Sequence, residues 1–208
     1  GKEKYCLRLS EIRFDKRKAV GILQIGIPSA FQYSLFAFAN LFVQSSVNSF
    51  DHVLVEGNSA AANADPLVYD MMAAFYTACS SFIAQNFGAR KKKRILQTYL
   101  ICLFYSFITS LVLGVGIYLA RYPFLYLFTS DKAVVEAGIT RLSIMALSYS
   151  ASAFMDASIA ASRGLGKTAV PTFVVVMGSC VFRIIWIYTI FAYFHTIQSL
   201  YILYVFSW

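Results

Sequence analysis

The sequence predicts an all-α integral membrane protein, a bundle of about six transmembrane helices of which the last is truncated. Composition is the first reason: 59% of the 208 residues are hydrophobic and only 13% are charged, whereas roughly a quarter of an ordinary soluble domain is charged. The second reason is that the apolar residues form long runs, and a run of about 20 spans the ~30 Å core of a bilayer. A soluble helical bundle is the alternative, but soluble helices average only about 11–12 residues.

Six segments account for these runs. They are Val20–Phe50, Ser59–Phe87, Ile95–Ala120, Ala133–Ser162, Thr168–Phe194 and a last one from about Ser199 to Trp208. The segments are uniformly apolar, unlike the alternating strands of a membrane barrel, and a helix satisfies its own backbone groups in lipid. The last ten residues would rise only ~15 Å as a helix. Because the chain also lacks an initiator Met, we expect it to be a piece of a longer protein.

Basic residues are concentrated in alternate loops. Seven lie in the first 18 residues, five form the run Arg90–Arg94, and Arg163 and Lys167 follow the fourth segment, so these three stretches hold 14 of the 18 basic residues. If every segment crosses once, the three stretches share a side, which the positive-inside rule places in the cytoplasm. We therefore expect residues 1–18 to form a cytoplasmic, basic, amphipathic linker, followed by a six-helix transmembrane lobe over residues 19–208.

The basic run at Arg90–Arg94 is thus interpreted as a topology anchor that also touches anionic lipid head groups. Nucleic-acid binding is not expected, because no soluble domain is available to present the patch. Catalytic and metal-binding patterns are also lacking: the four cysteines and two histidines are scattered, without the spacing of metal ligands. We expect no enzyme activity, no cofactor and no metal site, and transport is the default function.

The first segment is unusually rich in amides for a membrane span. Five occur in it, at Gln24, Gln32, Asn40, Gln44 and Asn48, and the last four drift slowly around one side of a helix. Such a side either hydrogen-bonds to other helices or lines a cavity, and five amides favour the cavity. The residues that we expect to line a substrate cavity are Gln32, Asn40, Gln44, Asn63 and Ser148.

The fourth segment carries a polar stripe. Ser148, Ser152 and Asp156 follow one another at intervals of four residues, which places them on one helix face. Asp156 precedes Arg163 by seven residues, so it lies ~10 Å from the end of the helix. A carboxylate inside a span is a candidate proton or cation site, and we expect Asp156 and Ser152 to couple ion movement. The alternative is a structural ion pair or a side chain that reaches the surface.

A second acidic residue, Asp70, lies at a depth similar to that of Arg183 and Arg141, about 15 Å from the outer ends of their segments. A charge inside the membrane needs a partner. We therefore expect Asp70 and Arg183 to form a structural charge pair.

Several stretches together resemble one family, the multidrug and toxic compound extrusion (MATE) transporters. They are QIGIPSAFQ at 24–32, QSSVNSF at 44–50, EGNSAAANADPLVY at 56–69, AQNFGARKKKRI at 84–95, YLFTSDKAVVEAG at 126–138 and SRGLGKTAVP at 162–171. The resemblance implies twelve helices in two lobes, of which this chain is the second, with helices seven to twelve. It also implies efflux of organic cations in exchange for H⁺ or Na⁺, a missing N-terminal lobe in the same polypeptide, and a bacterial inner membrane.

Some members of that family bind the coupling cation with carboxylates in helices seven and ten. At the corresponding level, helix seven of this chain offers Gln32 and Phe36, and helix ten offers Ser152, with Asp156 one turn nearer the cytoplasm. The alternatives are a related flippase for lipid-linked sugars or polysaccharides and a non-transporting membrane scaffold. A flippase would need many basic residues in its cavity, and only Arg183 and Arg141 are available.

Overall fold

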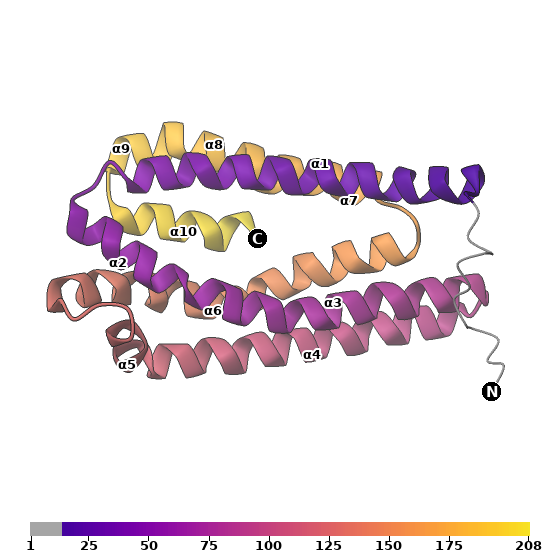
Figure 1. Ribbon diagram of the computed structural model, residues 1–208, viewed down its shortest axis with the longest axis horizontal. Coiled ribbons are helices and arrows are strands. Elements are labelled where there is room, and N and C mark those ends of the chain that lie inside the picture. Colours follow the sequence, from indigo (N-terminus) through magenta and orange to yellow (C-terminus); the bar gives the residue numbers. More distant parts are fainter. Residues whose placement is uncertain (1–13) are drawn as a thin grey trace.

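Helices form every regular element of the computed structural model over residues 14–208, the part of the chain that the structure describes (Figure 1). They are α1 (Lys16–Val47), α2 (His52–Ala62), α3 (Ala64–Gly88), α4 (Lys92–Leu119), α5 (Arg121–Tyr126), α6 (Lys132–Gly164), α7 (Ala169–Val175), α8 (Phe182–Trp186), α9 (Ala192–Phe194) and α10 (Ile197–Ser207). The π-helical segments Val176–Val181 and Ile187–Phe191 join α7, α8 and α9 into one continuous span. Five helical units of the described chain are long and apolar enough to cross a membrane, and α10 is a shorter apolar helix.

Most of the predicted segments agree with these bounds to within about four residues, but the second does not. It was expected to begin at Ser59, whereas the crossing begins at His52 and continues through a break at Asn63. The polar pair His52 and Glu56, 3.7 Å apart on the exposed surface of α2, hides the apolar character of the first turns. The side-chain amide of Asn63 donates to the carbonyl groups of Ser59 and Ala60 and ends α2.

The predicted linker over residues 1–18 lies mostly outside the described residues. Its last part already belongs to the first span, because α1 begins at Lys16. The carboxylate of Asp15 caps this helix by accepting from the backbone N–H groups of Arg17 and Lys18, a role for which Asp is well suited.

Two groups of helices make up the bundle. In the first, α6 is central and packs against α2, α3, α4 and α5. In the second, α1 lies alongside the span formed by α7, α8 and α9. The short helix α10 lies between the groups and contacts both α6 and α1, as Figure 1 shows.

Close backbone contacts at glycines hold the first group together. A Cβ atom at Gly114 of α4 would lie 2.1 Å from the carbonyl oxygen of Ala146 in α6. A Cβ at Gly164 would lie 2.7 Å from the carbonyl oxygen of Ser80 in α3, and one at Gly57 would lie equally close to α6. Small residues allow membrane helices to approach to this distance, so these glycines fix α6 against its neighbours.

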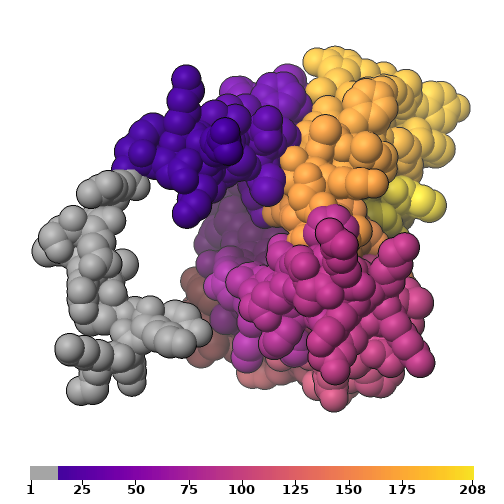
Figure 2. All heavy atoms as spheres, turned by 90° about the vertical axis from the view of Figure 1, so that its right-hand side faces the viewer, coloured from indigo at the N-terminus to yellow at the C-terminus, as the bar shows by residue number. Residues whose placement is uncertain are grey.

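The first helix is packed much less tightly. Only 11% of its most apolar window is buried, against 50% for α6, and a Cβ atom at Gly21 or Gly26 would meet nothing within 4 Å. Figure 2 shows the molecule hollowed between α1 and the end of the bundle where α3 turns into α4. The lobe is therefore open on the side where α1 and α3 face each other.

The basic stretches of the described chain lie at one end of the bundle, on the right of Figure 1. There α1 begins, α3 turns into α4 through Arg90–Arg94, and α6 joins α7 near Arg163 and Lys167. We call this the basic end. The prediction that these stretches share one side of the bundle is confirmed.

Candidate functional site

An unpartnered carboxylate marks the interior of the lobe. Asp156 is half-buried on α6, and within the described chain it takes part in no hydrogen bond and no ion pair. Tyr76 of α3 and Arg163 of α6 are near enough to interact with it electrostatically. The Tyr76 hydroxyl is itself buried without a hydrogen-bond partner among the described residues. Since buried polar groups are normally paired, this corner of the lobe has the capacity to bind a proton, a cation or water.

The serines of the predicted stripe lie as the spacing requires, on the buried face of α6. Each hydroxyl donates to a backbone carbonyl of its own helix: Ser152 to Tyr149, at 2.9 Å, and Ser148 to Met145, also at 2.9 Å. A hydroxyl oxygen keeps acceptor capacity after donating its proton. Ser148 and Ser152 therefore remain available as oxygen ligands toward the interior.

The buried amide of Gln32 joins three helices near the basic end. Its Oε1 atom accepts from the hydroxyl of Thr172 in α7 at 3.2 Å and from the guanidinium of Arg163 in α6 at 3.5 Å. The same guanidinium donates to the Tyr33 hydroxyl at 3.2 Å and lies 5.2 Å from the centre of its ring. Gln32 thus touches Arg163, a cation that is near enough to act on Asp156 electrostatically, and it holds α1 to the rest of the lobe at this level.

A second amide, Asn40, lies deeper in α1 and binds Arg183 of α8. The Asn40 Oδ1 atom accepts from Arg183 Nη1 at 2.6 Å, and Arg183 Nε donates to the hydroxyl of Ser207 at 3.1 Å. The guanidinium also lies over the rings of Phe36 and Tyr204, 4.5 and 4.7 Å from their centres. Arg183 is therefore a fully buried cation held by neutral groups.

The prediction that Arg183 pairs with Asp70 is wrong. Asp70 lies on the exposed face of α3, and the partner of Arg183 is Asn40. An interhelical ion pair instead joins Arg141 of α6 to Asp65 of α3, with a nitrogen–oxygen distance of 2.5 Å. Five residues separate Asp65 from Asp70, so helical geometry turns them about 140° apart, and only Asp65 faces α6.

Other polar groups complete the Arg141–Asp65 pair. The guanidinium of Arg141 donates to the side-chain oxygen of Asn58 at 2.9 Å and to its backbone carbonyl at 3.2 Å, while the Tyr149 hydroxyl donates to Asp65. The sequence did not predict this network. The distance of each residue from the outer end of its span could have indicated the pair. When the second span is taken to begin at His52, Asp65 lies closer than Asp70 to the level of Arg141.

An aromatic cluster connects the two buried arginines. The ring of Tyr149 stacks on Trp208 with 6.0 Å between centres, and Trp208 packs against Tyr204, which lies over Arg183. Tyr69 of α3 meets both Tyr149 and Trp208 edge-on, at 5.8 and 5.9 Å. These rings fill the space between α3, α6 and α10, so the polar interior near Asp156 has an aromatic wall.

Two of the predicted cavity residues, Gln44 and Asn63, are exposed in the described chain. Gln44 is exposed on α1 and donates to Asn48 at 2.9 Å, one turn along the same helix. Asn63 is exposed at the break between α2 and α3 and bonds to carbonyl groups of α2. In residues 14–208, no group of three or more His, Cys, Asp or Glu side chains is arranged to hold a metal ion.

Comparison with known proteins assigns both family and fold. Residues 28–189 match the MatE family model, while no curated protein matches the chain. A crystal structure of a MATE mutant superimposes with a TM-score of 0.84 and 19% identity, over 96% of this chain and 45% of that one.

Two further solved structures share the fold at 21% identity, over 90% of this chain and 41% of theirs. One is a MOP superfamily transporter from Pyrococcus furiosus, described by the reverse polarity of its binding pocket, with a TM-score of 0.71. The other is an outward-facing multidrug resistance MATE family transporter, with a TM-score of 0.67. The chain therefore spans less than half the length of these structures.

Proposed function

Because the chain belongs to the MatE family, we propose that it forms one lobe of a secondary transporter that exports organic cations in exchange for H⁺ or Na⁺. The lobe is a bundle of membrane-spanning helices with a polar interior, as such a transporter requires. We further propose that a second lobe of the same polypeptide completes the pathway, since the related structures are more than twice as long as this chain. The basic end faces the cytoplasm of a bacterial inner membrane under the positive-inside rule.

The observation that carries the proposal is the unpartnered carboxylate of Asp156. A charge in a membrane span costs several kcal/mol unless it is paired or exposed to water, so it is retained where it has a function. The other buried acid, Asp65, is already bound by Arg141 and Tyr149. Asp156 is thus the carboxylate of the lobe interior that is available to exchange a proton or Na⁺.

The coupling mechanism follows from the surroundings of Asp156. When Asp156 is negative, it attracts Arg163, whose guanidinium also reaches Gln32 and Tyr33 of α1. Binding of H⁺ or Na⁺ cancels this attraction, and Arg163 is then held only by the neutral groups of α1. In this mechanism α1 has two positions, and Asp156 binds the ion with a different affinity in each. Ion binding therefore changes the relative free energies of the two positions, as any ligand that drives a conformational change must do.

The proposed substrate surface is the hollow between α1 and α3. Gln32 and Asn40 of α1 and Ser148 of α6 contribute polar groups to the proposed pathway, and the rings of Tyr69 and Trp208 are suited to bind an organic cation through cation–π contacts. Gln44 and Asn63, which are exposed, contribute where the second lobe closes over this face.

A flippase for lipid-linked sugars is the second candidate within transport, and a structural observation weighs against it. Such a substrate carries a pyrophosphate, which needs free basic groups. Both buried arginines already hold helices together: Arg141 is bound to Asp65 and Asn58, and Arg183 is bound to Asn40 and Ser207. Among the described residues, one nitrogen of each, Arg141 Nε and Arg183 Nη2, has no hydrogen-bond partner. A membrane scaffold without transport activity is also disfavoured, because it would gain nothing from an unpaired carboxylate at Asp156 that is costly to place in a membrane span.

The Asp156→Asn variant tests the proposal directly. It preserves the shape of the side chain but cannot take up or release a proton, so we expect gradient-driven efflux to fall at least tenfold. The measurement is export of a fluorescent organic cation from vesicles containing the full-length transporter, under an imposed pH or Na⁺ gradient. Binding of the same cation to purified protein is measured in parallel and should persist.

Asp70→Asn is the matched control, because it removes a carboxylate of the same kind from an exposed face of α3. It should leave transport within twofold of the unmodified protein. Gradient-driven efflux by Asp156→Asn at the normal rate would remove this residue from the mechanism. If Asp156→Asn fails to accumulate as folded protein, Asp156→Glu, which keeps the charge, should restore both folding and transport; a folded but equally inactive Glu variant would indicate a geometric requirement.

A further inference from the structure

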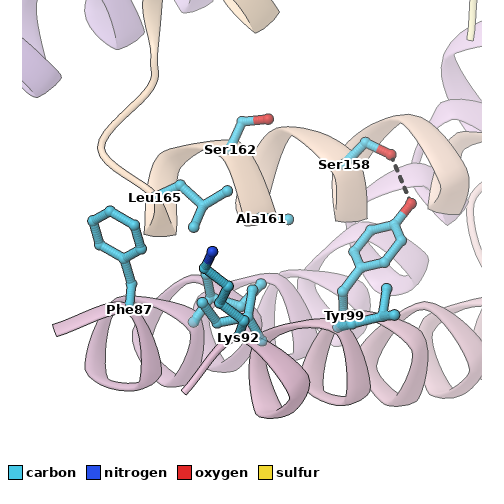
Figure 3. A pocket seen from close by; sticks show the side chains of 10 residues that line it. Phe87, Lys92, Tyr99, Ser158, Ala161, Ser162 and Leu165 are labelled. Atoms are coloured by element: carbon cyan, nitrogen blue, oxygen red, sulfur yellow. Dashed lines mark hydrogen bonds between the residues drawn. The ribbon is translucent and has the colours of Figure 1, made fainter. Parts of the chain in front are cut away.

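An open groove lies at the basic end, outside the polar interior. It lies between α4 and α6, is also lined by residues of α3 (Figure 3), and has a volume of about 530 Å³. Its apolar surface is formed by Ile83 and Phe87 of α3, Ile95 and Leu96 of α4, and Leu165, which directly follows α6. The volume lies within the range of sites for small ligands, about 300–1,000 Å³, so the groove is large enough for part of a lipid-sized molecule.

Helix packing explains why this groove exists. Close contact between α4 and α6 is made in the opposite half of the bundle, at Gly114 and Ala146. At the basic end, Gly164 brings α6 against the backbone of Ser80 in α3 instead. The start of α4 is linked to α6 by a side-chain hydrogen bond between Tyr99 and Ser158, at 3.0 Å, and the space beyond this bond remains open.

The mouth of the groove is strongly cationic. The Lys92 side chain belongs to its lining and points from α4 toward α6 in Figure 3, and the run Arg90–Arg94 surrounds it in sequence. The sequence contains no acidic residue between Asp70 and Asp131, nor after Asp156. In the described structure, the first turn of α4 therefore holds three cations with no acidic residue and no side-chain cap.

This charge arrangement favours an anion supplied from outside the chain. Cations at a helix N-terminus oppose the helix dipole, whereas a negative group there is stabilised by it. The groove offers the anion an ammonium group from Lys92 and hydroxyl groups from Ser162, Ser158 and Tyr99. Below them lies an apolar channel, which suits an acyl chain. An anionic head above an apolar tail, at the end of a membrane span, is the chemistry of an anionic phospholipid.

We propose that this groove binds one anionic phospholipid, with its phosphate at Lys92 and an acyl chain along Ile95, Leu96 and Leu165. Such a lipid would neutralise part of the charge in the first turn of α4 and fill the space between α4 and α6. The site is independent of the transport site, because Ser158 lies on the exposed face of α6 and Asp156 lies toward the interior.

Native mass spectrometry of the full-length protein in detergent tests this site. Delipidated protein is titrated with phosphatidylglycerol or with phosphatidylcholine carrying the same acyl chains. We expect one phosphatidylglycerol to bind at concentrations at which phosphatidylcholine does not. Lys92→Gln should weaken that binding about fivefold, close to the ~1 kcal/mol contributed by one basic residue near an anionic lipid.

Two matched controls separate the groove from the basic run as a whole. Lys93→Gln removes the same charge one residue away, outside the groove lining, and should leave phosphatidylglycerol binding within twofold. Ala161→Trp fills the groove and should abolish the bound lipid, whereas Leu100→Trp places the same ring on an exposed part of α4 and should not.

Three results would overturn the proposal. Equal binding of the two lipids to the unmodified protein would exclude recognition of the anionic head group. Equal losses from Lys92→Gln and Lys93→Gln would indicate diffuse attraction by the basic run without a defined site. A dimer mass that Ala161→Trp abolishes would assign the groove to contact between two copies of the protein.

Discussion

The helices around α6 and the helices around α1 are held together by different means. In the first group, glycines bring backbones into direct contact, as at Gly114 and Gly164, and a buried ion pair joins α3 to α6. In the second group, α1 is joined to its neighbours by hydrogen bonds that the side-chain oxygens of Gln32 and Asn40 accept from Thr172 and Arg183, and a Cβ atom at Gly26 or Gly178 would meet nothing within 4 Å. Direct backbone packing fixes the relative position of two helices, whereas hydrogen bonds between side chains persist when the helices shift slightly.

The difference bears on the proposed transport function, because in alternating access one part of the protein must move relative to another. Backbone contacts at glycine break completely when helices shift, but a hydrogen bond between long side chains can re-form after a shift. The α7–α9 span adds to this freedom, since it contains two π-helical segments, which are often found at functional sites. We therefore regard the α6 group as the rigid frame and α1 with α7–α9 as the movable part.

The largest expected effect concerns the ion pair of the frame. Asp65→Asn leaves Arg141 buried without a counter-charge, and removing one partner of a buried pair costs about 3–5 kcal/mol in soluble proteins. Thermal unfolding in detergent measures the loss. Asp70→Asn, on the exposed face of the same helix, should change stability by less than about 0.5 kcal/mol.

A double variant sharpens this test. Asp65→Asn combined with Arg141→Met removes both charges and should recover part of the lost stability, because no unpaired ion remains. If the double variant loses as much stability as the two single variants together, the interaction between Asp65 and Arg141 does not stabilise the protein. The ion pair would then no longer distinguish the α6 group from the α1 group.

The second effect comes from the glycine contacts. Gly114→Ala places a Cβ atom 2.1 Å from the carbonyl oxygen of Ala146 unless the helices move apart. Overpacking of this kind costs about 1–3 kcal/mol. Gly116→Ala is the matched control two residues away, where a Cβ would meet nothing within 4 Å; it should be neutral or stabilising by up to about 1 kcal/mol, because Ala is the better helix former. Equal melting temperatures for the two variants would contradict close packing of α4 on α6.

The smallest effect is expected in the movable part. Thr172→Val removes the hydroxyl that binds Gln32, and interhelical hydrogen bonds in membranes contribute about 0.6 kcal/mol on average. Thr189→Val is the control, since its hydroxyl donates to Ile185 of its own helix. Denaturant titration resolves the difference between them. A loss from Thr172→Val as large as that from Gly114→Ala would show that α1 is fixed as firmly as α4.

Much of the architecture was determined by the sequence alone. Apolar runs separated by basic loops fix where helices begin and end, because the cost of placing charge and unpaired backbone in lipid depends on local composition. The membrane class, the shared basic end and the family follow from such local signals. The start of the second span was mispredicted at Ser59 because His52 and Glu56 lie on the exposed side of α2, a fact of orientation that composition does not contain.

Only the tertiary structure decided which polar groups meet. The depth of a residue along its helix follows from counting, but its partner depends on how helices rotate against one another, and that rotation is set by contacts such as Gly114 on Ala146. As a result, Asp65 faces Arg141 and Asp70 faces outward, Arg183 binds Asn40, and Asp156 has no hydrogen-bond or ion-pair partner within residues 14–208. Charge inside the membrane could be located from the sequence, whereas its pairing required the packed bundle.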